Sequence, residues 1–261
     1  MTSLPLFYRS VVPLDRDAHR AGYLAQPQRF AFARSSHIVP ALAEEIGAAC
    51  RHLPVVFLPE SLGPVPVFLV GAAPGHCALI DEAGSWTGRY LPAYLRRYPF
   101  ILGESEGSAP LVCIDAETDL LRTEPAAEPP EASPTSLPLF TEDGQESPLL
   151  QERIRLVAEY AEAARRTAAF GRLLQDLKLL RALTIQVQHP LTGQSHTLHG
   201  ALGVEEAALA ALPDDAFARL RREGWLGMIY AHLVSLQAVA DFLVSAVPSS
   251  AASAAVMHGA A

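Results

Sequence analysis

The sequence has little cysteine, a single lysine and few charged residues. Cys50, Cys77 and Cys113 are widely spaced and form no CxxC pair, which excludes a zinc ribbon and a thioredoxin-type redox motif. Such cysteines usually act as small buried hydrophobic residues, and a reducing cytoplasm is the compartment that we expect for them. The chain has one lysine, Lys178, and nineteen arginines, and it is rich in alanine. This composition indicates a GC-rich bacterial genome.

Clusters of basic residues are also missing. The formal net charge is −8 and the isoelectric point is near 5.6. Nucleic-acid-binding proteins need surplus Lys and Arg to neutralise phosphates, so we expect no nucleic-acid partner. Because half of the residues are hydrophobic and only 18% are charged, the composition also excludes a wholly disordered chain.

A secretory signal and a membrane-spanning helix are the remaining absences. Met1–Arg9 reaches an arginine before any long apolar run, unlike a secretory signal. The most apolar segment, Trp225–Val247, carries His232 and Asp241. Since a carboxylate at the bilayer centre costs about 3 kcal/mol, we expect a buried helix here and no transmembrane segment.

The first half of the chain predicts short strands with two helices among them. The helices cover about Pro40–Arg51 and Leu91–Arg97, and the second stops before Pro99 because the residue before proline disfavours helix. The apolar runs of strand length are Val55–Leu58, Val65–Ala72, Cys77–Asp81 and Leu111–Asp115.

The composition changes between Thr123 and Pro138, where prolines and glutamates alternate and predict an extended, solvated linker. After it, Ser147 and Pro148 are a typical start for a long helix. The apolar stripe of this helix comprises Leu150, Ile154, Val157, Ala161, Ala164 and Ala168. The expected elements that follow are a hairpin of Thr184–His189 and Ser195–Leu202, two helices at Glu205–Leu212 and Asp214–Glu223, and the final apolar helix.

These elements predict an α+β fold. We expect a strand-rich N-terminal half with an antiparallel sheet and a helix-rich C-terminal half that carries a β-hairpin, the two sharing one core. The corresponding ranges are 1–122 for the strand-rich half, 123–138 for the linker, 139–247 for the helix-rich half and 248–261 for a disordered tail.

Three stretches resemble the SapC family of bacterial proteins. The first runs from Phe30 to Phe57 and contains Phe30-Ala31-Phe32-Ala33, Val39-Pro40 and Leu53-Pro54-Val55-Val56-Phe57. The second and most specific contains Arg89-Tyr90-Leu91-Pro92-Ala93-Tyr94-Leu95-Arg96-Arg97-Tyr98-Pro99-Phe100, followed by Val112-Cys113-Ile114-Asp115. The third is Leu226–Leu236. The resemblance implies labels of surface-array (S-layer) protein or peptide transport, and no catalytic residue.

Catalytic motifs are weak or incomplete. Gly103-Glu104-Ser105-Glu106-Gly107 matches GxSxG, but Pro110 and another strand follow instead of the helix that a nucleophile elbow needs. His196 and His199, with His189 nearby, would point to opposite faces of a strand, so we expect no metal there. The sequence has no HExxH, GxGxxG or GxxxxGK motif, and we expect no cofactor.

His232 and Ser235 share a face of the last helix, but Asp241 lies too far along it to complete a catalytic triad. A core histidine is the simpler interpretation, although we include His232 among the candidate binding residues.

The densest polar cluster is the segment from residue 89 to residue 98. Its candidate binding residues are Arg89, Tyr90, Tyr94, Arg96, Arg97 and Tyr98, because arginine forks bind carboxylates or phosphates and tyrosines offer rigid contact surfaces. The alternative is that the arginines pair with Asp81, Glu82, Glu104 or Asp115 and hold the short helix in place.

The sequence therefore favours a non-catalytic binding or accessory protein with an unknown protein or peptide partner. A homodimer is one arrangement that it allows. The alternatives are a hydrolase or other small-molecule enzyme, and an S-layer or peptide-transport component.

Overall fold

The computed structural model describes residues 4–26, 28–103, 110–123, 136–188 and 195–246. Strands predominate in the first half of these residues and helices in the second, which confirms the predicted α+β class. Among the described residues the strands form three sheets, and every strand pair in them is antiparallel.

The largest sheet takes strands from both halves of the chain. Its order is β10-β11-β4-β5-β3. The two halves meet where β11 pairs with β4 through Leu202 opposite Phe57. The strands are β3 (Ile38–Pro40), β4 (Val55–Leu58), β5 (Val65–Leu69), β10 (Leu180–Gln188) and β11 (Ser195–Val204).

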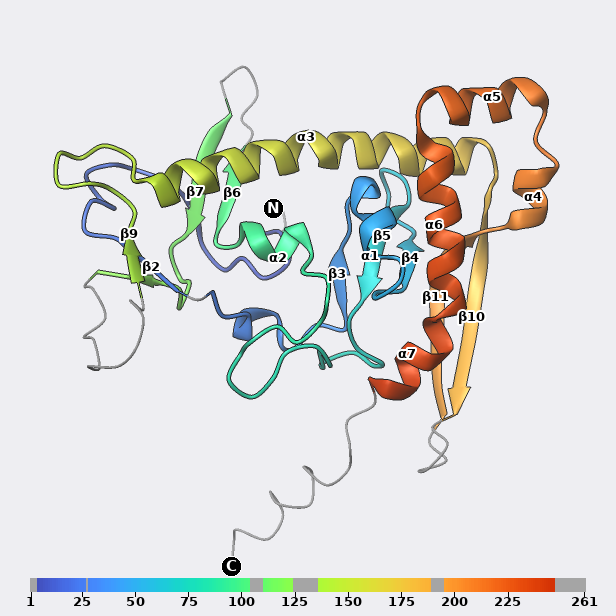
Figure 1. Cartoon of the computed structure of the whole chain (residues 1–261), viewed down its shortest axis with the longest axis horizontal. Coiled ribbons are helices and arrows are strands. Elements are labelled where there is room, and N and C mark those ends of the chain that lie inside the picture. Colours follow the sequence, from blue (N-terminus) through green and yellow to red (C-terminus); the bar gives the residue numbers. More distant parts are fainter. Residues whose placement is uncertain (1–3, 27, 104–109, 124–135, 189–194, 247–261) are drawn as a thin grey trace, which may run out of the picture.

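Two smaller sheets lie at the other end of the molecule (Figure 1). One has the order β1-β7-β6 and the other β8-β2-β9. Their strands are β1 (Val11–Pro13), β2 (Tyr23–Ala25), β6 (Phe100–Gly103), β7 (Leu111–Asp115), β8 (Leu121–Arg122) and β9 (Ser136–Pro138). Strand β9 lies within the range predicted as a linker, because Leu137 pairs with Leu24 of β2. Residues 124–135 of that range lie outside the described residues.

Helix α3 (Pro148–Asp176) runs along most of the length of the molecule and passes both groups of sheets (Figure 1). The predicted start is confirmed, because the Ser147 hydroxyl accepts a hydrogen bond from the Leu150 N–H at 3.2 Å. Near the other end, a Cβ on Gly171 would lie 2.0 Å from the Pro64 carbonyl oxygen, so only glycine lets α3 approach this loop so closely.

The buried face of α3 differs from the predicted stripe. Leu150 and Val157 are buried as expected, but Tyr160 and Thr167 are also buried. Thr167 tolerates burial because its hydroxyl accepts a hydrogen bond from the Ala43 N–H and donates one to the Ala163 carbonyl. The predicted stripe did not include these two hydroxyl-bearing residues, because their burial depends on partners in other elements.

The other helices are shorter. The expected helix at residues 40–51 is reduced to a 3-10 turn and one α-helical turn, and α2 starts only after Pro92. The helices are η1 (Ala31–Ala33), η2 (Ala43–Glu45), α1 (Ile46–Ala49), α2 (Ala93–Arg97), α4 (Glu206–Ala210), α5 (Asp214–Arg222), α6 (Trp225–Gln237) and α7 (Val239–Ser245). In the described part of the chain no single helix is long and apolar enough to cross a membrane; α6 and α7 together meet that test but are bent by 49°.

The predicted strand at Cys77–Asp81 is wrong. Only a single bridge forms there, between Ile80 and Trp86. The preceding strand also ends at Leu69 instead of Ala72, because the chain folds back on itself: a Cβ on Gly71 would lie 1.9 Å from the His76 carbonyl oxygen. An apolar run of strand length therefore became a tight, buried loop.

Candidate functional site

The segment from residue 89 to residue 98 leads into and through α2, which packs against α3 and β3. The structure separates its six candidate residues instead of gathering them on one surface. Arg89 is exposed, and it forms no ion pair or hydrogen bond with another described residue. Tyr94, Arg97 and Tyr98 are buried, while Tyr90 and Arg96 are partly exposed.

Arg97 lies in a cage of aromatic rings. Its guanidinium carbon is 4.1 Å from the centre of the Tyr160 ring, 4.3 Å from that of Tyr94 and 5.6 Å from that of Tyr8. The side chain is only 7% exposed and has no carboxylate partner among the described residues. Aromatic faces stabilise such a desolvated cation. The alternative that Arg97 is structural is therefore favoured, with tyrosines as its partners instead of a carboxylate.

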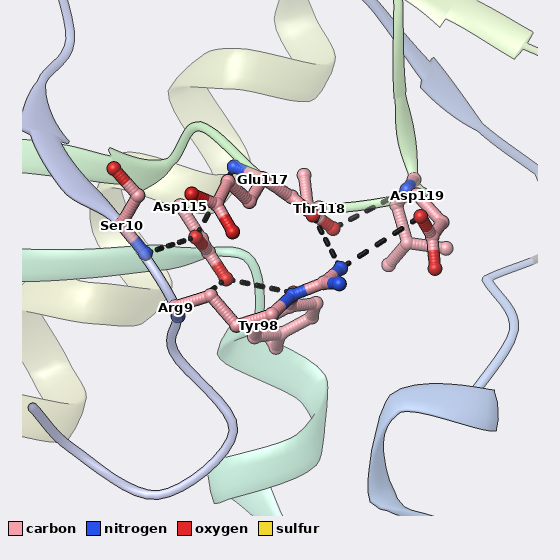
Figure 2. Close-up of polar contacts among 8 residues, drawn as sticks. Arg9, Ser10, Tyr98, Asp115, Glu117, Thr118 and Asp119 are labelled. Atoms are coloured by element: carbon pink, nitrogen blue, oxygen red, sulfur yellow. Dashed lines mark hydrogen bonds and ion pairs between the residues drawn. The ribbon is translucent and has the colours of Figure 1, made fainter.

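Tyr98 belongs to a different cluster, centred on the buried carboxylate of Asp115 (Figure 2). This carboxylate accepts hydrogen bonds from the Tyr98 hydroxyl at 2.9 Å and from the backbone N–H groups of Arg9 and Ser10 at 3.1 and 2.8 Å. Burial raises the pKa of Tyr98 to about 12, so the phenol stays a donor. The cluster ties the N-terminal segment to β7.

Tyr90 and Arg96 meet a carboxylate that the sequence analysis did not single out, Glu45. Its Oε1 accepts hydrogen bonds of 2.7 Å from the Tyr90 hydroxyl and from the Ala93 N–H, and its Oε2 accepts one of 3.0 Å from the Leu42 N–H. The Arg96 guanidinium lies 3.9 Å from Glu45 Oε1, which is a long ion pair. Glu45 is thus fully used, while Arg96 has a long ion pair with Glu45 and also interacts with the Tyr90 hydroxyl.

Two adjoining hollows, called here the α2–α3 groove, open beside Arg96. The first has a volume of about 240 Å³ and the second about 460 Å³. Arg96, Leu156 and Glu159 line both hollows. The first is completed by Leu42, Glu44, Glu45, Ala48, Tyr90, Ala93, Tyr160 and Ala163, and the second by Gln28, Phe30, Leu91, Glu152, Arg153 and Arg155.

The second hollow places Arg153 beside Arg96. An Arg153 guanidinium nitrogen donates to the Arg96 carbonyl at 3.1 Å, and no described carboxylate pairs with Arg153. Burial lowers the pKa of Arg153; Glu152 raises it and the positive charge of Arg96 lowers it. The Nε atoms of both arginines are buried and lack a hydrogen-bond partner. Unpaired donors on two neighbouring cations are typical of an anion-binding site.

Of the expected carboxylate partners, the three that the structure describes, Asp81, Glu82 and Asp115, form no ion pair with Arg89, Arg96 or Arg97. Asp81 and Glu82 instead offer their backbone carbonyls to Arg34, and Asp115 binds Tyr98. Glu104 lies outside the described residues.

His232 lies in the core, away from the groove. Its Nε2 accepts a hydrogen bond of 3.0 Å from the Val204 N–H, so the neutral ring carries its proton on Nδ1, which is buried without a partner. Burial lowers its pKa to about 4. Ser235 donates to the His232 carbonyl and accepts from the Val55 N–H, while Asp241 is exposed. These contacts join α6 to β4 and β11.

Where the structure describes them, the other candidate motifs add no site. The residues of the GxSxG motif from Glu104 onward, and His189, lie outside the described residues. His196 and His199 are on β11, and His199 is exposed. No group of three His, Cys, Asp or Glu side chains that could hold a metal ion occurs among the described residues.

Glu45 and Arg153 are the groove residues in contact with Arg96 that sequence reasoning missed. The sequence did contain a signal for Glu45: it follows Leu42 by three positions and precedes Ala49 by four, which places a carboxylate on an apolar helix face. Arg153 gives no comparable signal, because charged residues on both sides resemble an ordinary solvated helix surface.

Comparison with known proteins identifies the family. No curated protein and no solved structure matches the chain. The SapC family model matches residues 14–242, a range that contains α2, the groove and the core around His232. The chain therefore belongs to the SapC family.

Proposed function

We propose that this SapC-family chain is a non-catalytic binding or accessory protein that holds a protein or peptide partner at the α2–α3 groove. The observation that carries this proposal is the state of Arg96. Its side chain is 43% exposed, lines both hollows and has one charge partner, Glu45, at 3.9 Å. A half-exposed arginine that lines a hollow surface is a typical recognition residue.

The described residues also lack the pairings that hydrolysis needs. No histidine ring among them is hydrogen-bonded to a serine or cysteine side chain, and the ring of His232 is enclosed in the core. Ser105 lies outside the described residues, so the GxSxG motif needs an experimental test by substitution of this serine. We expect Ser105→Ala to leave the turnover of generic ester and peptide substrates unchanged; a hundredfold loss would establish the hydrolase alternative.

Affinity capture from an extract of the native cells tests the proposed function. The full chain is immobilised in three forms: unchanged, Arg96→Glu and Arg89→Glu. Both substitutions reverse an arginine charge, but only Arg96 lines the groove. We expect Arg96→Glu to lose the captured partner and Arg89→Glu to keep it, with circular dichroism showing that both variants are folded. Equal capture by both variants would exclude the groove as the binding site.

A further inference from the structure

The charged residues that line the second hollow indicate the chemistry of a ligand. Three arginines line it, Arg96, Arg153 and Arg155, together with Glu152 and Glu159. The net charge of the lining is therefore +1. Arg155 lies 3.9 Å from Glu159 on the same helix face, and Arg96 has its ion pair with Glu45, which lines the first hollow and not the second. Glu152 raises the pKa of Arg153 but forms no ion pair with it.

The donor groups of these two arginines are incompletely used. Arg153 spends one N–H on the Arg96 carbonyl, and the Nε of each arginine has no partner. Two like charges held together in partly buried positions repel each other, which costs free energy unless an anion lies between them. The Arg96 side chain is 43% exposed and lines the hollow, so its guanidinium can fork to a carboxylate there.

From these observations we infer that the second hollow binds a single carboxylate between Arg96 and Arg153, carried by a ligand with an apolar group. This inference rests on the proposed function and specifies the chemistry of its partner. A singly charged group matches the lining charge of +1, whereas a phosphate dianion would exceed it and would face Glu152 and Glu159. The apolar part has Phe30, Leu91 and Leu156 to contact.

A peptide titration tests the inference on the full chain. The probes are N-acetyl-Ala-Leu with a free terminal carboxylate, the same dipeptide as its amide, N-acetyl-Glu-Leu-amide and inorganic phosphate. The readout is the Nε–Hε NMR resonances of Arg96 and Arg153, assigned with Arg96→Lys and Arg153→Lys. We expect a carboxylate probe to shift both resonances and the uncharged amide to shift neither. The first and third probes distinguish a chain terminus from an acidic side chain as the source.

Matched variants separate groove binding from general charge effects. Lysine keeps the positive charge but removes the fork, so Arg96→Lys and Arg153→Lys should each weaken carboxylate binding at least fivefold. Arg89→Lys, which lines neither hollow, should leave it unchanged. The inference is overturned if no carboxylate probe shifts the two resonances, if the lysine variants bind equally well, or if phosphate binds more tightly than both carboxylates.

The two proposals fail in different ways. If Arg96→Glu still captures the partner from cell extract, the groove is not the binding site and the proposed function fails with the inference. If capture depends on Arg96 but neither carboxylate probe competes with the captured partner, only the carboxylate inference fails.

Discussion

The guanidinium of Arg97 packs against one side of Tyr160, with its central carbon 4.1 Å from the ring centre, while the same tyrosine lines the first hollow of the α2–α3 groove. The buried arginine therefore supports the wall of the groove from behind. Tyr94 also contacts the Tyr160 ring edge-on, with the two ring centres 6.0 Å apart. The polar segment from residue 89 to residue 98 thus has two roles: Arg96 lines the groove, and Arg97 supports the groove residue Tyr160.

Removal of Arg97 is expected to lower stability and not only binding. Arg97→Ala takes away a desolvated cation–π contact and leaves a cavity among three tyrosines, which together cost about 2–4 kcal/mol. Chemical denaturation measures the loss. Arg97→Met fills the cavity without a buried charge and should retain at least about 1 kcal/mol more stability than Arg97→Ala. Arg89→Ala, at an exposed site, should change stability by no more than about 0.5 kcal/mol. An unchanged midpoint for Arg97→Ala would contradict the structural role.

Glu45 and Tyr90 are expected to act as a coupled pair. Tyr90→Phe removes one hydrogen bond and should cost about 1 kcal/mol. Glu45→Ala strands the Leu42 and Ala93 N–H groups as well as the Tyr90 hydroxyl and should cost about 3–5 kcal/mol. Because both changes break the same contact, the double variant should be about 1 kcal/mol more stable than the sum of the two losses predicts. Strict additivity in urea denaturation would show that the Tyr90 hydroxyl and the Glu45 carboxylate are not energetically coupled.

His232 predicts a loss of stability in mild acid. The ordinary pKa of histidine is about 6.5, and burial lowers that of His232 to about 4. The unfolded chain therefore binds the proton more readily: stability is complete above pH 6.5 and falls as the pH drops toward 4, with about 2 kcal/mol lost by pH 5. We expect His232→Gln, whose amide oxygen can still accept from Val204, to lack this share of the pH dependence. His199→Gln, at an exposed site, should keep it. Identical pH profiles for all three proteins would refute the assignment to His232.

Cleavage of the linker is expected to leave the two halves associated. Limited proteolysis within residues 123–138 would cut the chain between β8 and β9, but the largest sheet takes β10 and β11 from one fragment and β3, β4 and β5 from the other. The main core likewise combines Phe57 and Phe68 with Phe170 and Ile229. Gel filtration should return both fragments in one peak. Separate elution would mean that the shared sheet is too weak to hold them.

Sequence patterns predicted correctly those elements that are stabilised by interactions between residues near in the sequence. Ser147 and Pro148 start a helix wherever they precede a helical sequence, because the cap and the fixed φ of proline act within one turn. The runs at Val55–Leu58 and Leu111–Asp115 became strands at the predicted residues, since central, apolar strands carry their own signal. The similar run at Cys77–Asp81 failed because a strand also needs a partner, and this one has a single bridge.

By itself, the sequence determined the α+β class and the family, and it indicated residues 89–98 as a candidate binding segment. Only the tertiary structure decided what each residue in that segment does. Arg96 and Arg97 are adjacent in the chain, yet one faces an open groove and the other a closed aromatic cage, because successive side chains on a helix point about 100° apart. Their partners, Glu45, Arg153 and Tyr160, are more than forty positions away. A sequence pattern reports spacing along the chain, whereas charge pairing and burial depend on distance in space.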